Sequence, residues 1–131
     1  MSGDKLNLDL IQMVQQARRQ HDQDAIPSQA SGVYWIEARC AQMPALTART
    51  GERRIETTLT EVDQQWAAIK SATEAGTLGY KAKVSTAPAQ GQREQRMICV
   101  RTYDADDQAD VERIRQALQQ LGFSGMRYVR D

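Results

Sequence analysis

Two short stretches of the chain, residues 80–86 and 97–103, alternate between charged or polar side chains and apolar ones. A period of two is typical of a β-strand with one face in the core and the other in solvent. A segment with helical spacing precedes the first stretch, and another follows the second. This order favours an antiparallel pair of strands whose apolar face is covered by helices and whose polar face carries all the charges.

The alternation divides the side chains of these two strands into two sets. The apolar set, Ala82, Val84, Ile98 and Val100, is expected to face the helices. The opposite face is expected to carry Lys81, Lys83, Ser85, Cys99, Arg101 and Tyr103.

Three helices are indicated by apolar residues at helical spacing. The first begins at Asp4 and runs to about Asp22. The second begins at Thr60, which with Asp63 resembles a capping box, and ends at Gly76. The third begins in a group of aspartates that suits a helix start, and it ends at Gly122. The expected buried stripes are Val62, Trp66, Ile69 and Ala72 in the second helix, and Val111, Ile114, Leu118 and Leu121 in the third.

Two further strands, residues 33–38 and 126–130, are predicted from their β-branched and aromatic residues, and residues 54–59 could form an extra one. The resulting order is an N-terminal helix followed by β-α-β-β-α-β. We therefore predict an α+β fold, a two-layer sandwich with a mainly antiparallel sheet and helices on one face. Residues 1–30 form the N-terminal helix and linker, and residues 31–131 form a single domain. The other face of the sheet is open or is covered by the N-terminal helix.

Composition excludes some classes of function. Lysine plus arginine equals aspartate plus glutamate, 17 against 17, so no whole-molecule field attracts nucleic acid or an anionic membrane. No apolar run approaches the roughly 20 residues that a membrane span needs. Cys40 and Cys99 share no motif spacing, so we expect no disulfide and a cytoplasmic location. We expect no cofactor and no metal, because the aspartates at 104, 106, 107 and 110 lack the spacing of a calcium loop.

A longer motif surrounds the first strand: Trp66-x-x-Ile69-x-x-Ala72-Thr73-x-x-Gly76-x-Leu78-Gly79-x-x-Ala82-Lys83-Val84-Ser85-Thr86. With the later run from Ile98 to Asp104, it resembles the basophilic-leukemia-expressed-protein family over residues 31–131. The resemblance implies a fold similar to that of the cap-binding translation initiation factor, whose curved sheet holds a methylated guanine between tryptophans. Some members carry a phosphothreonine-lyase label.

The candidate ligand-binding residues are those of the open face. Lysine and arginine can contact phosphate, and aromatic rings can stack on a base. The alternative is a solvated face on which Glu37 pairs with a neighbouring cation across strands. The last strand adds either Arg127 or the pair Tyr128 and Arg130. The predicted ligand-binding set is Trp35, Lys81, Lys83, Ser85, Arg101 and Tyr103.

Three functions remain open from the sequence. The first is a binding module for a phosphate-bearing ligand, a nucleotide or an RNA end, on the open face. The second is a phosphothreonine-lyase-like enzyme with Lys81 or Lys83 as base and Arg101 as phosphate clamp. The third is a protein-interaction domain that uses its N-terminal helix. His21, the only histidine, lies at a helix end and has no catalytic partner near it in the sequence.

Overall fold

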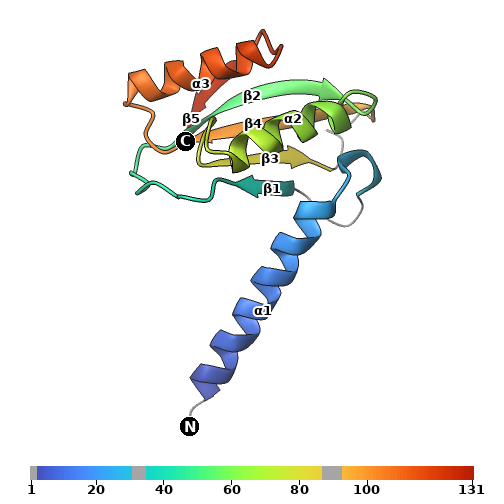
Figure 1. The fold of residues 1–131 in the computed structure, drawn as a ribbon, viewed down its shortest axis with the longest axis vertical. Helices are drawn as coiled ribbons and strands as arrows, with labels where there is room; N and C mark the ends of the chain where they lie inside the picture. The colour runs from blue at the N-terminus through green and yellow to red at the C-terminus, as the bar shows by residue number, and fades with distance from the viewer. Residues whose placement is uncertain (1–2, 31–34, 87–92) are drawn as a thin grey trace.

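The computed structural model describes residues 3–30, 35–86 and 93–131, with side chains from residue 8 onward (Figure 1). The described part of the chain forms three α-helices, one short 3₁₀ helix and one five-stranded sheet. The helical elements are α1 (Gly3–Asp24), η1 (Pro27–Gln29), α2 (Val62–Glu74) and α3 (Gln108–Gln120). The strands are β1 (Trp35–Arg39), β2 (Gly51–Thr58), β3 (Lys81–Ser85), β4 (Gln95–Thr102) and β5 (Arg127–Arg130).

The sheet is antiparallel throughout, with the strand order β1-β3-β4-β2-β5. The predicted α+β sandwich is therefore confirmed. The optional strand at residues 54–59 exists as the longer β2, which lies between β4 and β5 and pairs with β4 over eight residues. The prediction for residues 33–38 is confirmed from Trp35 onward, and residues 33 and 34 lie outside the described ranges.

The core lies between the sheet and the two helices α2 and α3. Trp66 of α2 is 2% exposed, and Ile114 and Leu118 of α3 are fully buried. They pack in one cluster with the apolar residues of the strands, as the alternation predicts. Leu121 is a correction, because it follows the last residue of α3 and is 43% exposed. The helix ends before the turn that would have brought Leu121 onto the buried stripe.

The predicted capping box at the start of α2 is wrong. The helix begins at Val62, and Glu61 at the N-cap makes no side-chain cap hydrogen bond. Asp63 instead accepts hydrogen bonds from the backbone N–H of Ser28, at 2.9 Å, and from its hydroxyl, at 2.5 Å. The hydrogen-bond partner of this aspartate is thus a residue of η1. The two hydrogen bonds tie the segment after α1 to the start of α2.

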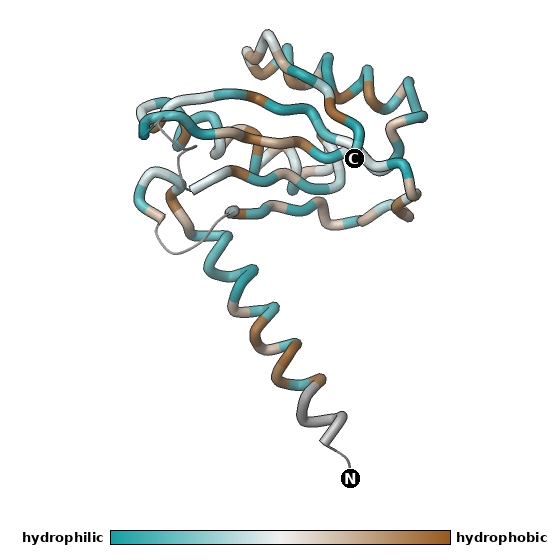
Figure 2. Tube along the Cα trace, turned by 180° about the vertical axis from the view of Figure 1, so that it is seen from behind, coloured by the Kyte–Doolittle hydropathy of each residue, from teal (hydrophilic) through white to brown (hydrophobic). Residues whose placement is uncertain are grey.

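The helix α1 projects away from the sheet instead of lying on it (Figure 1). Its large apolar residues from Leu8 to Val14 are exposed, and Figure 2 shows hydrophobic positions on the part of the helix that projects from the sheet. Its C-terminal end contacts the sheet at the β1 edge, where Arg18 donates a 2.8 Å hydrogen bond to the carbonyl of Trp35. The face of the sheet opposite α2 and α3 is therefore left uncovered by α1.

Candidate functional site

The open face of the sheet is formed by alternate residues of all five strands. Their positions follow from the strand register, because side chains one residue away point into the helical layer. Tyr128 pairs with Arg53 in the register and its hydroxyl contacts that of Thr102, so β5 contributes Arg127 to the open face. The charged members are Glu37, Arg39, Glu52, Arg54, Glu56, Lys81, Lys83, Arg101 and Arg127, joined by Asp131 after β5.

Glu52 lies on β2 opposite Arg101 of β4 and is only 3% exposed. Its carboxylate is 2.7 Å from Arg54 Nε, 2.9 Å from Arg101 Nη1 and 3.8 Å from Lys83 Nζ. Burial alone would raise the pKa of Glu52, but the hydrogen bonds from Arg54 and Arg101 outweigh it and hold the pKa below its ordinary value. One buried carboxylate therefore gathers three cations around it.

Arg101 is the most strongly held of these cations. Its guanidinium makes a two-pronged contact with Asp131, at 2.9 and 2.5 Å, and also donates to the hydroxyl of Tyr80 at 3.1 Å. The bond to Asp131 is the main cause of the raised pKa of Arg101, and it lowers the pKa of Asp131 to about 2. Such bidentate pairs fix the guanidinium in one orientation, so Arg101 is anchored in place.

The β1 side of the face combines a second ion-pair group with an aromatic ring. Lys81 Nζ lies 2.7 Å from Glu37, and Arg39 lies 3.6 Å from the same carboxylate. Burial acts to raise the pKa of Glu37, but the hydrogen bond and charge of Lys81 bring it below its ordinary value. Lys83 Nζ lies 4.5 Å from the centroid of the Trp35 ring, within the range of a cation–π contact.

The structure brings together five of the six residues predicted to bind a ligand: Trp35, Lys81, Lys83, Ser85 and Arg101. The Ser85 hydroxyl accepts a 2.9 Å hydrogen bond from the backbone N–H of Met97, which joins β3 to β4. Tyr103 is not part of this group. Its hydroxyl donates to Asp107 before α3, and its side chain lines a separate cavity with Cys40 and Gly79. A ligand contact for Tyr103 stays a prediction.

The expected basic face is in fact a face of mixed charge, with six cationic and four acidic side chains. The pairing of Glu37 with Lys81 across β1 and β3 agrees with the solvated-face alternative. Sequence reasoning missed Glu52 and Arg54 because β2 was not expected beside β4. The alternating charges of Glu52, Arg54 and Glu56 were the available signal. Arg53, a charged residue on the opposite face, interrupts this alternation in the sequence.

Cys99 lies on the same side of β4 as Arg101 but is only 1% exposed, beneath the layer of ion pairs. Burial, with the nearby charge of Glu52, raises the pKa of its thiol to about 12. The reactive form of a cysteine is the thiolate. Cys99 therefore fills space under the open face.

Of the aspartates at 104, 106, 107 and 110, Asp107 is the N-cap of α3 and Asp110 lies in its first turn. Asp107 accepts a 3.1 Å hydrogen bond from the N–H of Asp110, as an N-cap does. Asp104 pairs with Arg49 at 3.0 Å and accepts from the N–H of Asp106. Within the described ranges, no group of three or more potential metal ligands comes together. Among the same residues, no helix is both long and apolar enough to cross a membrane.

Comparison with known proteins agrees with the resemblance seen in the sequence. Residues 36–127 match the family model described as basophilic leukemia-expressed protein Bles03, which covers more than two thirds of the chain. The match extends from the second residue of β1 to the first residue of β5, so it includes most of the open face but neither Trp35 nor Asp131. A search of curated proteins gave no match.

Proposed function

Because this chain belongs to the basophilic leukemia-expressed protein Bles03 family, and the matched residues include most of the open face, we propose that this face binds a phosphate-bearing ligand. The ligand class is a nucleotide or the phosphorylated end of an RNA. The proposal includes a cytoplasmic location, which the two free cysteines support. A cap-binding-like fold, as the family resemblance implies, would place a nucleotide on this same face.

The observation that carries the proposal is the contact between Lys83 and Trp35. It puts a phosphate-binding ammonium over the face of an aromatic ring, on which a base would stack once Lys83 turns toward the phosphate. Lys83 also has the longest ion pair to Glu52, at 3.8 Å. Lys83 is therefore the most weakly held of the three cations around Glu52. Turning Lys83 toward a phosphate breaks a longer contact with Glu52 than moving Arg54 or Arg101 would.

The acidic groups of the face do not oppose this arrangement equally. Glu52 is buried and surrounded by Arg54, Arg101 and Lys83, so its charge is compensated before a ligand arrives. Glu37 is compensated by Lys81 in the same way. The six cations and four carboxylates leave an excess of two positive charges. We expect the phosphate to lie over Lys83, next to Trp35.

Binding by matched lysine variants tests the proposal. Lys83→Ala removes the proposed phosphate contact, and Lys70→Ala is the control. Lys70 is equally exposed (22% against 25%) and also ion-paired, but it lies on α2. The probes are guanosine triphosphate, adenosine triphosphate and an end-phosphorylated RNA oligonucleotide. Calorimetry should show that Lys83→Ala lowers the binding affinity roughly tenfold, equal to about 1.4 kcal/mol. Lys70→Ala should bind like the wild type. Equal binding by both variants, or none by the wild type, contradicts the proposal.

The phosphothreonine-lyase alternative gains less support from the geometry. A general base must be able to lose its proton, and a desolvated lysine can do so. Lys81 and Lys83 are each partly exposed and each lies within 4 Å of a carboxylate, at 2.7 and 3.8 Å, so neither is in the desolvated setting that such a base needs. Release of phosphate from a phosphothreonine peptide, lost in Lys83→Ala, would support the enzyme.

A protein-interaction function is the second candidate, because α1 exposes a row of large apolar side chains. A contiguous exposed apolar surface is typical of an interaction site. Light scattering and chemical cross-linking of the wild type and of Ile11→Asp/Val14→Asp would test it. Association that the double variant leaves unchanged would exclude this surface. The exposed residues are Leu8, Leu10, Ile11, Met13 and Val14.

A further inference from the structure

Strand β1 is one edge of the sheet, so half of its backbone groups point away from β3. Cys40 N–H donates to the carbonyl of Tyr80, which places residue 40 in a hydrogen-bonded pair with the β3 side. Backbone groups alternate along an antiparallel strand. The N–H and C=O groups of Trp35, Glu37 and Arg39 therefore point outward, where they could accept another strand.

The C-terminal end of α1 occupies two of these outward groups. Arg18 donates to the carbonyl of Trp35 at 2.8 Å, and Asp22 accepts from the N–H of Glu37 at 3.2 Å. The two α1 side chains are themselves 3.5 Å apart, and Asp22 is only 3% exposed. A buried aspartate bonded to an edge-strand N–H is a built contact, so α1 covers the first half of this edge.

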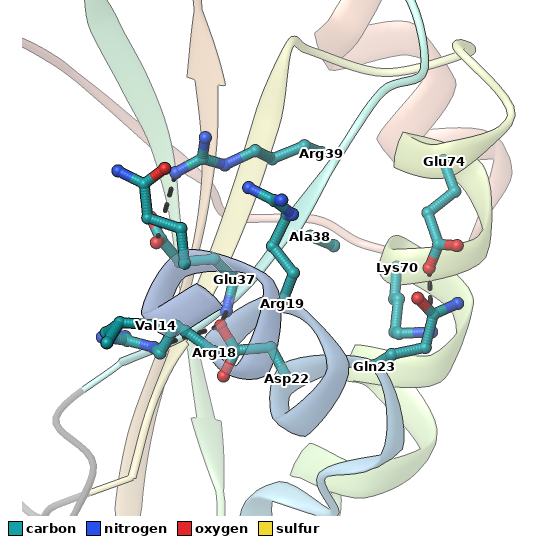
Figure 3. A pocket seen from close by; sticks show the side chains of 11 residues that line it. Val14, Arg18, Arg19, Asp22, Gln23, Glu37, Ala38, Arg39, Lys70 and Glu74 are labelled. Carbon is teal, nitrogen blue, oxygen red and sulfur yellow. Dashed lines mark hydrogen bonds and ion pairs between the residues drawn. The ribbon is translucent and has the colours of Figure 1, made fainter. Parts of the chain in front are cut away.

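The second half of the edge is not covered in this way. Among the described residues, no hydrogen bond reaches the outward carbonyl of Glu37 or the outward groups of Arg39. Beside them lies a cavity of about 460 Å³ between α1, β1 and α2, lined by Ala38 among others (Figure 3). The cavity leaves space next to β1 on the helical side.

We propose that β1 is a strand-pairing surface for a second copy of this chain, and that α1 controls access to it. The two β1 strands would pair antiparallel about a two-fold axis at Ala38. In this register, Glu37 of each copy lies opposite Arg39 of the other.

Charge complementarity selects this register and this partner. Opposite charges directly across an antiparallel pair are favourable, whereas like charges are not. A register that pairs Glu37 with Glu37 of the second copy would place two carboxylates opposite each other. Shifting one strand by two residues along the other pairs Glu37 with Arg39 instead and removes this repulsion. Because the interface is two-fold symmetric, the favourable Glu37–Arg39 contact occurs twice.

The same register explains why α1 acts as a gate. The paired strands would exchange four backbone hydrogen bonds, from the N–H groups of Glu37 and Arg39 in each copy. Asp22 already accepts from the N–H of Glu37. While α1 is docked, two of those four bonds cannot form, and the end of the helix also stands beside the strand. Release of α1 removes both obstacles.

The first test releases the gate. In the full chain, Arg18→Ala/Asp22→Ala should shift the protein from monomer toward dimer at least tenfold in dissociation constant, measured by light scattering over a range of concentrations. Adding Arg39→Glu should return it to monomer, whereas adding Arg39→Lys should not. A release variant that stays monomeric overturns the proposal. Self-association or aggregation of the Arg18→Ala/Asp22→Ala variant that Arg39→Glu does not reduce also overturns the proposal.

The second test reads the register directly. Opposed residues of a non-hydrogen-bonded antiparallel pair have Cα atoms about 4.5 Å apart, so Ala38→Cys should cross-link two copies across the axis. Ala38→Cys is introduced into the Arg18→Ala/Asp22→Ala chain, which also carries Cys40→Ser. The control is Ala41→Cys in this same chain. A disulfide dimer with cysteine 38 but not with cysteine 41 is expected. Equal yields at both positions, or none at 38, contradict the register, and circular dichroism checks that each variant is folded.

Discussion

The Lys83 ammonium lies 4.5 Å from the centroid of the Trp35 ring, although the two residues are not opposite each other in the sheet. Lys83 is registered with Glu37, and Trp35 with Ser85, so their contact is diagonal across β1 and β3. Diagonal neighbours are within reach only of long and aromatic side chains. The contact therefore depends on this pair of residue types and on the strand register together.

Trp66→Ala should be the most destabilising change in α2. Truncating a fully buried tryptophan costs about 3–5 kcal/mol, a large part of the stability of a small domain. Trp35→Ala is the matched control, because Trp35 is only half-buried and should cost less than about 2 kcal/mol. Urea denaturation measures both, and equal losses would contradict the assigned core.

The ion pairs of the open face predict that stability falls in acid. The pKa values of Glu52, Glu37 and Asp131 are lower in the folded chain than their ordinary values of 4.5, 4.5 and 3.8, and that of Asp131 is about 2. A carboxyl group whose pKa is depressed by folding stabilises the fold above its unfolded-state pKa. This stabilisation is lost as the pH falls through the folded-state pKa. The free energy of unfolding should decline from about pH 4.5 to about pH 2.

Glu52→Gln separates the contribution of Glu52 to the acid-induced loss of stability from that of the other carboxylates. Losing its charged hydrogen bonds should cost about 1.5–3 kcal/mol at neutral pH, and the gap to the wild type should narrow in acid, where Glu52 is protonated in both states. Glu56→Gln is the control, since Glu56 is 74% exposed. A gap that stays constant with pH would show that the charge of Glu52 is not the cause.

Tyr103 should report on Asp107. The hydrogen bond to this carboxylate, with burial, raises the pKa of Tyr103 to about 12. Asp107→Asn keeps an N-cap side chain but removes the charge, so the pKa of Tyr103 should fall toward its ordinary value of 10. Asp107→Ala should also lose about 1 kcal/mol of stability. Ultraviolet titration follows the phenol, and an unchanged titration in Asp107→Asn would contradict the assignment.

Gly79 should not tolerate a side chain. A Cβ atom there would overlap the backbone carbonyl oxygen of Arg101, which is fixed in β4. Gly79→Ala should cost about 1–3 kcal/mol through this overlap and should shift the amide signals of Arg101 and Thr102. Gly76→Ala is the control: it has a φ of 82° but open space around it, so it should cost about 1 kcal/mol without moving β4. Similar spectra for both variants would contradict the close approach.

Local periodicity was enough to predict most of the layered fold. The apolar faces of β3, β4, α2 and α3 lie within one strand or one helix, so a period of two or of 3.6 residues assigns them. The same is true of Trp66, whose burial follows from its helical stripe. These features do not depend on which strands are neighbours.

The charge balance of the site depends on strand order and could not be predicted. Glu52 meets Arg101 only because β2 lies beside β4, and Asp131 meets it only because the chain returns along β5. Asp63 finds its partner Ser28 across 35 residues, which local spacing cannot show. The stripe of α1 was visible, but its exposure is a consequence of where the helix leaves the sheet.

Chemical-shift mapping tests the central claim most directly. Isotope-labelled protein is titrated with guanosine triphosphate, adenosine triphosphate and an end-phosphorylated RNA oligonucleotide, with inorganic phosphate as the control for simple charge. The account predicts saturable shifts at the Trp35 indole N–H and at the amides of Lys83 and Arg101, with α2 unchanged. Saturating probe that leaves these three signals in place, or shifts them no more than α2, would contradict it.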